Sequence, residues 1–82
     1  MSESKFQAKL IKNLEKEGWY VIKIIQTNKN GIPDLLCLHF KHPPKFIEVK
    51  AKDGTVSELQ KYRQKEIFNK TGIKTENIYE DS

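Results

Sequence analysis

The chain has 82 residues, of which 37% are hydrophobic and 32% are charged, and its net charge at pH 7 is +4. This length predicts one small domain, residues 1–82, with a modest core. No stretch approaches the roughly 20 apolar residues of a membrane helix, and the N-terminus lacks the apolar core of a signal peptide. The surplus of 15 basic over 11 acidic residues suits a polyanionic partner, although many soluble proteins share such a surplus.

Residues 4–17 are predicted to form the first helix. Its apolar stripe consists of Phe6, Leu10, Ile11 and Leu14. Either Ser2 or Ser4 can cap the start, and Ser4 with Gln7 fits a capping box. Gly18 is expected to end the helix.

Three strands are predicted next, at residues 19–25, 34–40 and 45–52. The prolines of His42-Pro43-Pro44 mark a turn between the last two, which are close enough to form an antiparallel hairpin. Cys37 lies in the middle strand and is the only cysteine, so no internal disulfide can form. A buried, reduced thiol and a cytoplasmic location are therefore expected.

A second helix is predicted to begin near Thr55, with Glu58 completing its capping box, and to stop at Gly72. Its inner face is expected to comprise Val56, Leu59, Tyr62 or Arg63, Ile67 and Phe68. Residues 74–79 are predicted to form a short, polar final strand. The order α-β-β-β-α-β fits one α/β domain with a mixed sheet flanked by helices.

Two carboxylates are the leading candidates for chemistry. Asp34 follows Gly-Ile-Pro at the start of an apolar run, while Glu48 and Lys50 are two apart in a strand and so share one face. The hairpin can bring Asp34 to Glu48, where two like charges favour a hard divalent cation. Alternatively, Asp34 is a turn residue and the other two are the solvent face of an edge strand.

Three motifs carry a resemblance to a known family: Gly31-Ile32-Pro33-Asp34, Ile47-Glu48-Val49-Lys50 and Ser57-Glu58-Leu59-Gln60. Their spacing resembles the VRR-NUC branch of the PD-(D/E)XK nuclease superfamily, over nearly the whole chain. The resemblance implies a restriction-endonuclease-like fold and a Mg²⁺- or Mn²⁺-dependent endonuclease. It further implies action on branched DNA such as four-way Holliday junctions.

The resemblance also implies roles for particular residues. Asp34, Glu48, the carbonyl of Val49 and Glu3 are the implied metal ligands, and Lys50 and Gln60 assist catalysis. An acid at Glu3 equally suits the helix dipole, and Gln60 could equally lie on the helix surface. The expected contacts with DNA are Lys23, Lys52 and Lys61, although Lys23 could also simply face solvent.

The polar final strand departs from the family pattern, in which this strand is more apolar. A homodimer that shares its last strand or packs its sheet edges would complete such a domain. Two other functions remain open. One is a non-catalytic nucleic-acid-binding module that uses the lysines of both helices, and the other is a structural partner subunit of a larger nuclease.

Overall fold

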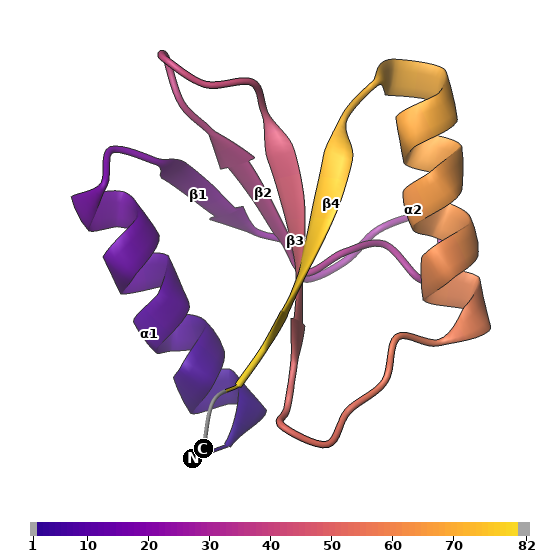
Figure 1. Ribbon diagram of the computed structural model, residues 1–82, viewed down its shortest axis with the longest axis horizontal. Helices are drawn as coiled ribbons and strands as arrows, with labels where there is room; N and C mark the ends of the chain where they lie inside the picture. Colours follow the sequence, from indigo (N-terminus) through magenta and orange to yellow (C-terminus); the bar gives the residue numbers. More distant parts are fainter. Residues whose placement is uncertain (1, 81–82) are drawn as a thin grey trace.

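A computed structural model describes residues 2–80, and within that range two helices accompany one four-stranded sheet (Figure 1). The elements follow the expected order: α1 (Glu3–Lys16), β1 (Tyr20–Lys23), β2 (Leu35–Leu38), β3 (Lys45–Lys50), α2 (Glu58–Thr71) and β4 (Lys74–Tyr79). The strands lie in the order β1-β2-β3-β4. Pairing is antiparallel from β1 to β3 and parallel between β3 and β4, so the α/β class and the mixed sheet are confirmed.

The first helix begins earlier than the Ser4 capping box predicted. Ser2 is the cap, and its hydroxyl accepts a hydrogen bond from the Lys5 amide at 3.3 Å. Ser4 therefore lies inside the helix. Gln7 is buried instead of reaching back to the cap, because it sits on the face of α1 that turns toward the sheet.

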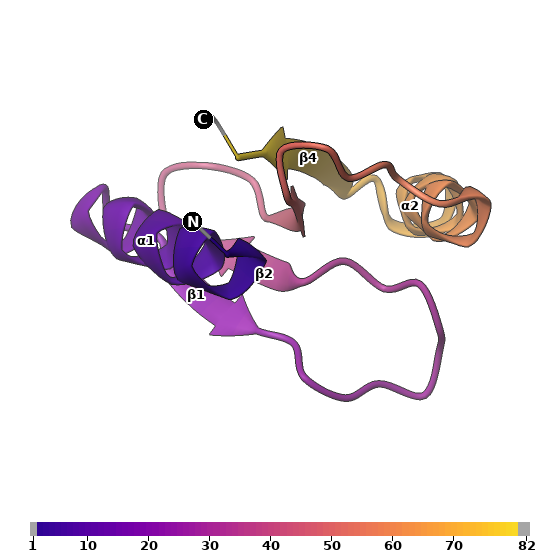
Figure 2. The ribbon, with the colours of Figure 1, turned by 90° about the horizontal axis from the view of Figure 1, so that it is seen from below.

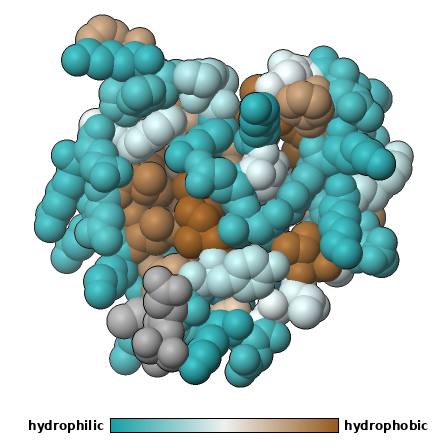
Figure 3. Space-filling model, in the orientation of Figure 1, coloured by the Kyte–Doolittle hydropathy of each residue, from teal (hydrophilic) through white to brown (hydrophobic). Residues whose placement is uncertain are grey.

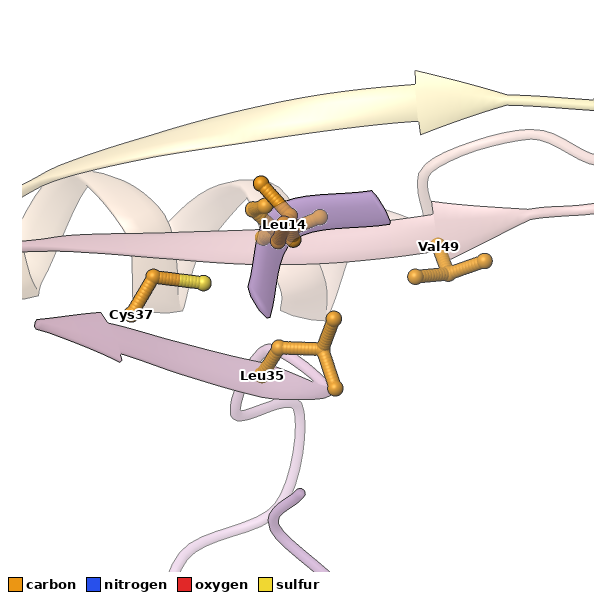
Figure 4. Packing of buried hydrophobic residues seen from close by; sticks show 5 residues of the cluster. Leu14, Leu35, Cys37 and Val49 are labelled. Carbon is orange, nitrogen blue, oxygen red and sulfur yellow. The ribbon is translucent and has the colours of Figure 1, made fainter. Parts of the chain in front are cut away.

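The hydrophobic core lies between α1 and one face of the sheet. Its buried members are Leu14, Leu35, Cys37, Ile47 and Val49, and the last four have no exposed surface. Figure 4 shows Leu14 over β3, with Leu35 and Cys37 on β2 beside it. The Cys37 thiol is free and buried, as predicted, and burial raises its pKa.

The hairpin prediction is confirmed by the register, in which Leu35 pairs with Ile47. All three of the first strands are shorter than predicted. The register also makes β3 a central strand, because β4 pairs with it along its whole length, from Lys45 with Lys74 to Lys50 with Tyr79.

The polar final strand forms in full. Its six residues pair with β3, and Ile78 packs against the core, while most of its other side chains are exposed. A polar composition suits a strand at the edge of a sheet. The weakness of β4 is therefore not a reason to expect a shared strand in a dimer.

The second helix starts two residues later than its predicted cap. Ser57 caps it, and Gln60 completes the capping box in place of Thr55 and Glu58. No residue of α2 is buried. Of the expected inner face, Leu59, Tyr62 and Phe68 are exposed, Arg63 and Ile67 are half-buried, and Val56 precedes the helix.

The long connection between β1 and β2 reaches out to α2 (Figure 2). The Arg63 side chain donates from Nε to the Asn30 carbonyl at 2.7 Å. Gly31 has φ +81°, and a Cβ atom there would lie 2.9 Å from Leu59 Cγ. Glycine is needed because the backbone adopts a left-handed conformation and lies close to the helix.

The surface in the view of Figure 3 is mainly hydrophilic, with one apolar patch beside α1 and smaller ones toward α2. Within residues 2–80, neither helix is long and apolar enough to cross a membrane.

Candidate active site

Asp34 and Glu48 meet where β2 begins and β3 approaches its end. The register that pairs Leu35 with Ile47 places position 34 across from position 48. Asp34 Oδ2 accepts a hydrogen bond of 2.8 Å from the Val49 amide. This bond holds the first carboxylate beside the second, as the hairpin prediction required.

Glu48 is buried in the sheet and is only 3% exposed. Its Oε2 atom lies 3.4 Å from Gln60 Nε2 and 3.9 Å from Lys50 Nζ. Its Oε1 atom is buried and has no hydrogen-bond partner. An edge-strand position facing solvent is therefore ruled out for Glu48, and a buried carboxylate oxygen without a partner is costly unless a ligand uses it.

The surroundings of Glu48 favour its protonated form in the absence of a cation. Burial, then a hydrogen bond that only the protonated form of Glu48 can donate to Asp34, and the negative charge of Asp34 raise the pKa of Glu48 from 4.5 to about 8. Lys50 opposes this rise, and Glu3 adds a small repulsion. When both carboxyls are ionised, they form a negative centre that the single Lys50 ammonium group does not balance.

Gln60 links the start of α2 to this centre. Its Oε1 accepts from the Ser57 amide at 2.9 Å, and its Nε2 donates to Glu48. The capping box fixes the side chain so that its amide is aimed at the carboxylate. Gln60 is therefore brought into the site and does not lie free on the helix surface.

The oxygen donors at this centre fit a hard divalent cation such as Mg²⁺ or Mn²⁺. Glu48 Oε1 has no other partner, and only the Oδ2 atom of Asp34 is used by Val49. Among residues 2–80, no three His, Cys, Asp or Glu side chains form a metal-binding group. Glu3 is exposed in the first turn of α1 and does not join the other two acids in such a group, so its role as a ligand stays a prediction.

Successive side chains of β3 point to opposite faces of the sheet, and each face is covered by a different helix. Val49 and Ile47 face α1, whereas Glu48 and Lys50 face the opposite side, where Gln60 of α2 meets them. On this second face, Gln64 and Asn77 also exchange two side-chain hydrogen bonds. The two helices thus cover opposite faces of the sheet.

The three lysines predicted to contact DNA are all exposed but lie in different places. Lys23 pairs with Leu35 and so belongs to the α1 side of the sheet, away from the Glu48 side. Lys52 follows β3 in the turn before α2. Lys61 lies on α2, 3.4 Å from Glu58, which is exposed.

Two contributors were not recognised in the sequence. Ser57 sets the orientation of Gln60, and Arg63 ties the loop before Asp34 to α2. That loop encloses a polar pocket of about 380 Å³, whose wall includes Asp34, Lys29 and Asn30. The Gly-Ile-Pro sequence signalled a turn here, but contact with α2 depends on the tertiary fold.

The VRR-NUC domain family matches residues 2–79, which is nearly the whole chain. No curated protein matches it significantly. The family match spans all three motifs, the pair of half-buried Asp34 and buried Glu48, and the Gln60 amide that contacts Glu48. The chain belongs to the VRR-NUC family and carries a nuclease domain of the PD-(D/E)XK type.

Proposed function

We propose that this chain is a metal-dependent endonuclease that hydrolyses phosphodiester bonds in branched DNA such as four-way junctions. The carrying observation is the buried Glu48, whose Oε1 lacks a partner next to Asp34. Burial of this carboxylate costs desolvation free energy, and coordination of a cation would offset that cost. The cytoplasm is the proposed location, and the free, buried Cys37 is consistent with it.

Asp34 and Glu48 are the proposed ligands of Mg²⁺ or Mn²⁺, with the Val49 carbonyl and Glu3 as further candidates. A cation bound there lowers the pKa of a water molecule and offsets charge on the phosphate oxygens.

Lys50 supplies a fixed positive charge beside the reacting phosphate. Its Nζ lies 3.9 Å from Glu48 Oε2 and its side chain is only partly exposed, so its position is restricted. A preorganised charge of this kind stabilises the charge that develops on the phosphate in the transition state. Gln60 acts as a positioning residue, because it holds Glu48 Oε2 and leaves Oε1 to a ligand.

A lysine-lined groove between α2 and β4 supports DNA as the substrate. The groove has a volume of about 420 Å³ and is lined by Lys61, Gln64, Lys65, Phe68, Lys74 and Thr75. The hydroxyl of Thr75 is buried there without a hydrogen-bond partner. The ammonium groups of Lys61, Lys65 and Lys74 suit the phosphates of a DNA backbone.

A homodimer is also proposed. Its basis is an exposed apolar surface on β1 and β2, not the polar composition of the final strand. α2 meets the second sheet face at β3 and β4, and this face continues onto β1 and β2 with Tyr20, Ile22 and Leu38 exposed. A second copy of the chain would cover these side chains. Two copies would present two Glu48 centres to the two strands of one junction.

The test is cleavage of a labelled four-way junction, a flap and a plain duplex in Mn²⁺, Mg²⁺ or chelator. Wild type is compared with Glu48→Gln, which keeps the volume of the side chain but removes its charge. We expect metal-dependent cuts near the branch point in wild type and none in the variant. Binding without cleavage of any substrate would instead indicate a non-catalytic nucleic-acid-binding module.

A further inference from the structure

The loop that joins β2 to β3 carries a fully displayed aromatic ring. Phe40 is 92% exposed, the highest value among the large hydrophobic side chains of the described chain. The loop stands out at the top of Figure 1, beyond the ends of β2 and β3. The ring is held out in solvent with its surface free, so it can stack on a flat ligand.

The loop is anchored, so the ring is held in place. His39 Nδ1 accepts from the Lys41 amide at 3.0 Å, which leaves the proton on Nε2 to donate to the Glu17 carbonyl at 3.1 Å. The ring of His42 stacks on Trp19, with centroids 5.6 Å apart and planes 20° apart. Two prolines then fix the backbone before β3.

The same loop is cationic. Residues 39–45 read His-Phe-Lys-His-Pro-Pro-Lys and include no acid. Lys41 Nζ lies 5.9 Å from the Phe40 ring centroid, and Lys45 Nζ lies 4.6 Å from the Trp19 ring centroid. Lys45 also pairs with Glu76, so Lys41 is the cation at the tip itself. A flat apolar ring beside an ammonium group matches an unpaired base followed by its phosphate.

The tip is continuous with the surface proposed to bind DNA. A pocket of about 280 Å³ at its base is lined by Pro43, Pro44, Lys45, Gly72, Lys74 and Glu76, and Glu76 pairs with Lys45. Lys74 also lines the groove along α2. Glu48 lies three residues beyond Lys45 on β3, about 10 Å along the strand at roughly 3.3 Å per residue, and its side chain points to the opposite face of the sheet. A DNA branch that contacts both the tip and the carboxylates would therefore pass around the β4 edge, where Lys74 lies.

We propose that Phe40, with Lys41, forms a stacking site for an unpaired nucleobase at the branch of a DNA substrate. This inference rests on the proposed function for the nature of the substrate. It adds a reason why branched DNA would be preferred to a plain duplex, in which every base is already stacked on both sides. In a plain duplex only the charges of the tip can contribute.

The test is binding in chelator, where no cleavage can occur. A junction and a flap carry 2-aminopurine at the branch, and a plain duplex serves as the reference. We expect Phe40→Ala to lose about tenfold in affinity for the branched DNAs, since one base stacked on an aromatic ring contributes roughly 1–3 kcal/mol. Affinity for the duplex should change less than about twofold, and the quenching of 2-aminopurine by wild type should disappear. Phe40→Trp should keep both the preference and the quenching.

Tyr62→Ala is the matched control, because Tyr62 is also an exposed ring with a cation, Arg63, 5.4 Å from its centroid. Its replacement should leave the ratio of branched to duplex affinity unchanged. An unchanged ratio in Phe40→Ala would overturn the stacking site. So would a change of oligomeric state in that variant, because Phe40 would then contact a second copy of the chain.

Cleavage in Mn²⁺ separates this proposal from the proposed function. If wild type binds branched DNA in a Phe40-dependent way but never cuts, the stacking site stands and the nuclease proposal falls. If wild type cuts branched DNA and Phe40→Ala cuts it with the same KM, the stacking site falls and the nuclease proposal stands.

Discussion

The two helices have the same length, 14 residues, and both begin at a serine cap, yet they stand in very different relations to the sheet. α1 buries Leu14 in a core with Leu35 and Val49. α2 buries no residue and meets the sheet through the amides of Gln60 and Gln64. The two faces of the sheet therefore differ in role. The face packed on α1 stabilises the fold by apolar burial, and the other face carries the charged side chains of the candidate site.

The largest expected effect comes from substituting the two carboxylates, which should abolish cleavage but leave the fold intact. Asp34→Asn or Glu48→Gln should lower metal-dependent cleavage by about a thousandfold or more, because each removes a charged ligand. Circular dichroism and a folded melting transition should be retained. Full activity in either variant would show that the two carboxylates are not the catalytic centre.

The reverse experiment removes packing from the α1 face. Leu35→Ala should destabilise the protein by about 2–5 kcal/mol, because Leu35 has no exposed surface. The same change on the other face, Leu59→Ala, should cost about 1 kcal/mol or less, since Leu59 is 43% exposed. Urea unfolding of both variants measures the contrast. Equal losses would mean that α2 contributes as much apolar burial as α1.

Substitution of two glutamines on α2 can distinguish a role in the candidate site from a role in helix packing. Gln60→Ala should reduce cleavage by about 10–100-fold, as expected when a residue that orients a metal ligand is removed. Gln64→Ala, a change on the same helix, breaks the bonds to Asn77 of β4 but does not touch Glu48. It should leave kcat nearly unchanged, and similar losses of kcat in both variants would assign Gln60 to helix stability alone.

The last contrast concerns the pH dependence of stability in chelator. The Glu48 carboxyl titrates at its ordinary pKa of 4.5 when unfolded and at about 8 when folded. Between these values the native state holds a proton that the unfolded state has lost, so stability falls as pH rises from 5 to 8, by up to about 1.4 kcal/mol per unit. Melting temperatures across this range measure it. Glu48→Gln should flatten the dependence, and a wild-type stability that rises over the same range would contradict the burial of Glu48.

Much of this arrangement could be predicted from local patterns. Alternation placed Glu48 and Lys50 on one face, and the short hairpin placed Asp34 beside them. The prediction of Thr55 as the cap of α2 was wrong, and Ser57 is the cap. Both side chains can accept from an amide three residues on, so local sequence does not separate them. Gln60 has two roles at once, a cap and a neighbour of Glu48, which only the docking of α2 on the second face reveals.

Other features depend wholly on tertiary contacts. The exposure of Leu59 and Phe68 contradicts the expected inner face, because α2 lies over a sheet face that is largely polar beneath it. The polar final strand was predicted but seemed too weak to complete the sheet, and pairing with a central β3 accounts for it. The anchoring of His39 to Glu17 joins residues 22 positions apart, so no local pattern signals it.

The most direct test of the central claim is calorimetric titration of the protein with Mn²⁺ at several pH values from 6 to 9, for wild type, Glu48→Gln and Gln64→Ala. We expect wild type and Gln64→Ala to bind the cation, with release of up to about one proton below pH 8 that fades above it. Glu48→Gln should show neither the binding nor the proton release. Equal binding by Glu48→Gln, or wild-type binding with no release of protons at pH 6–7, would contradict a cation site built on the buried carboxylate.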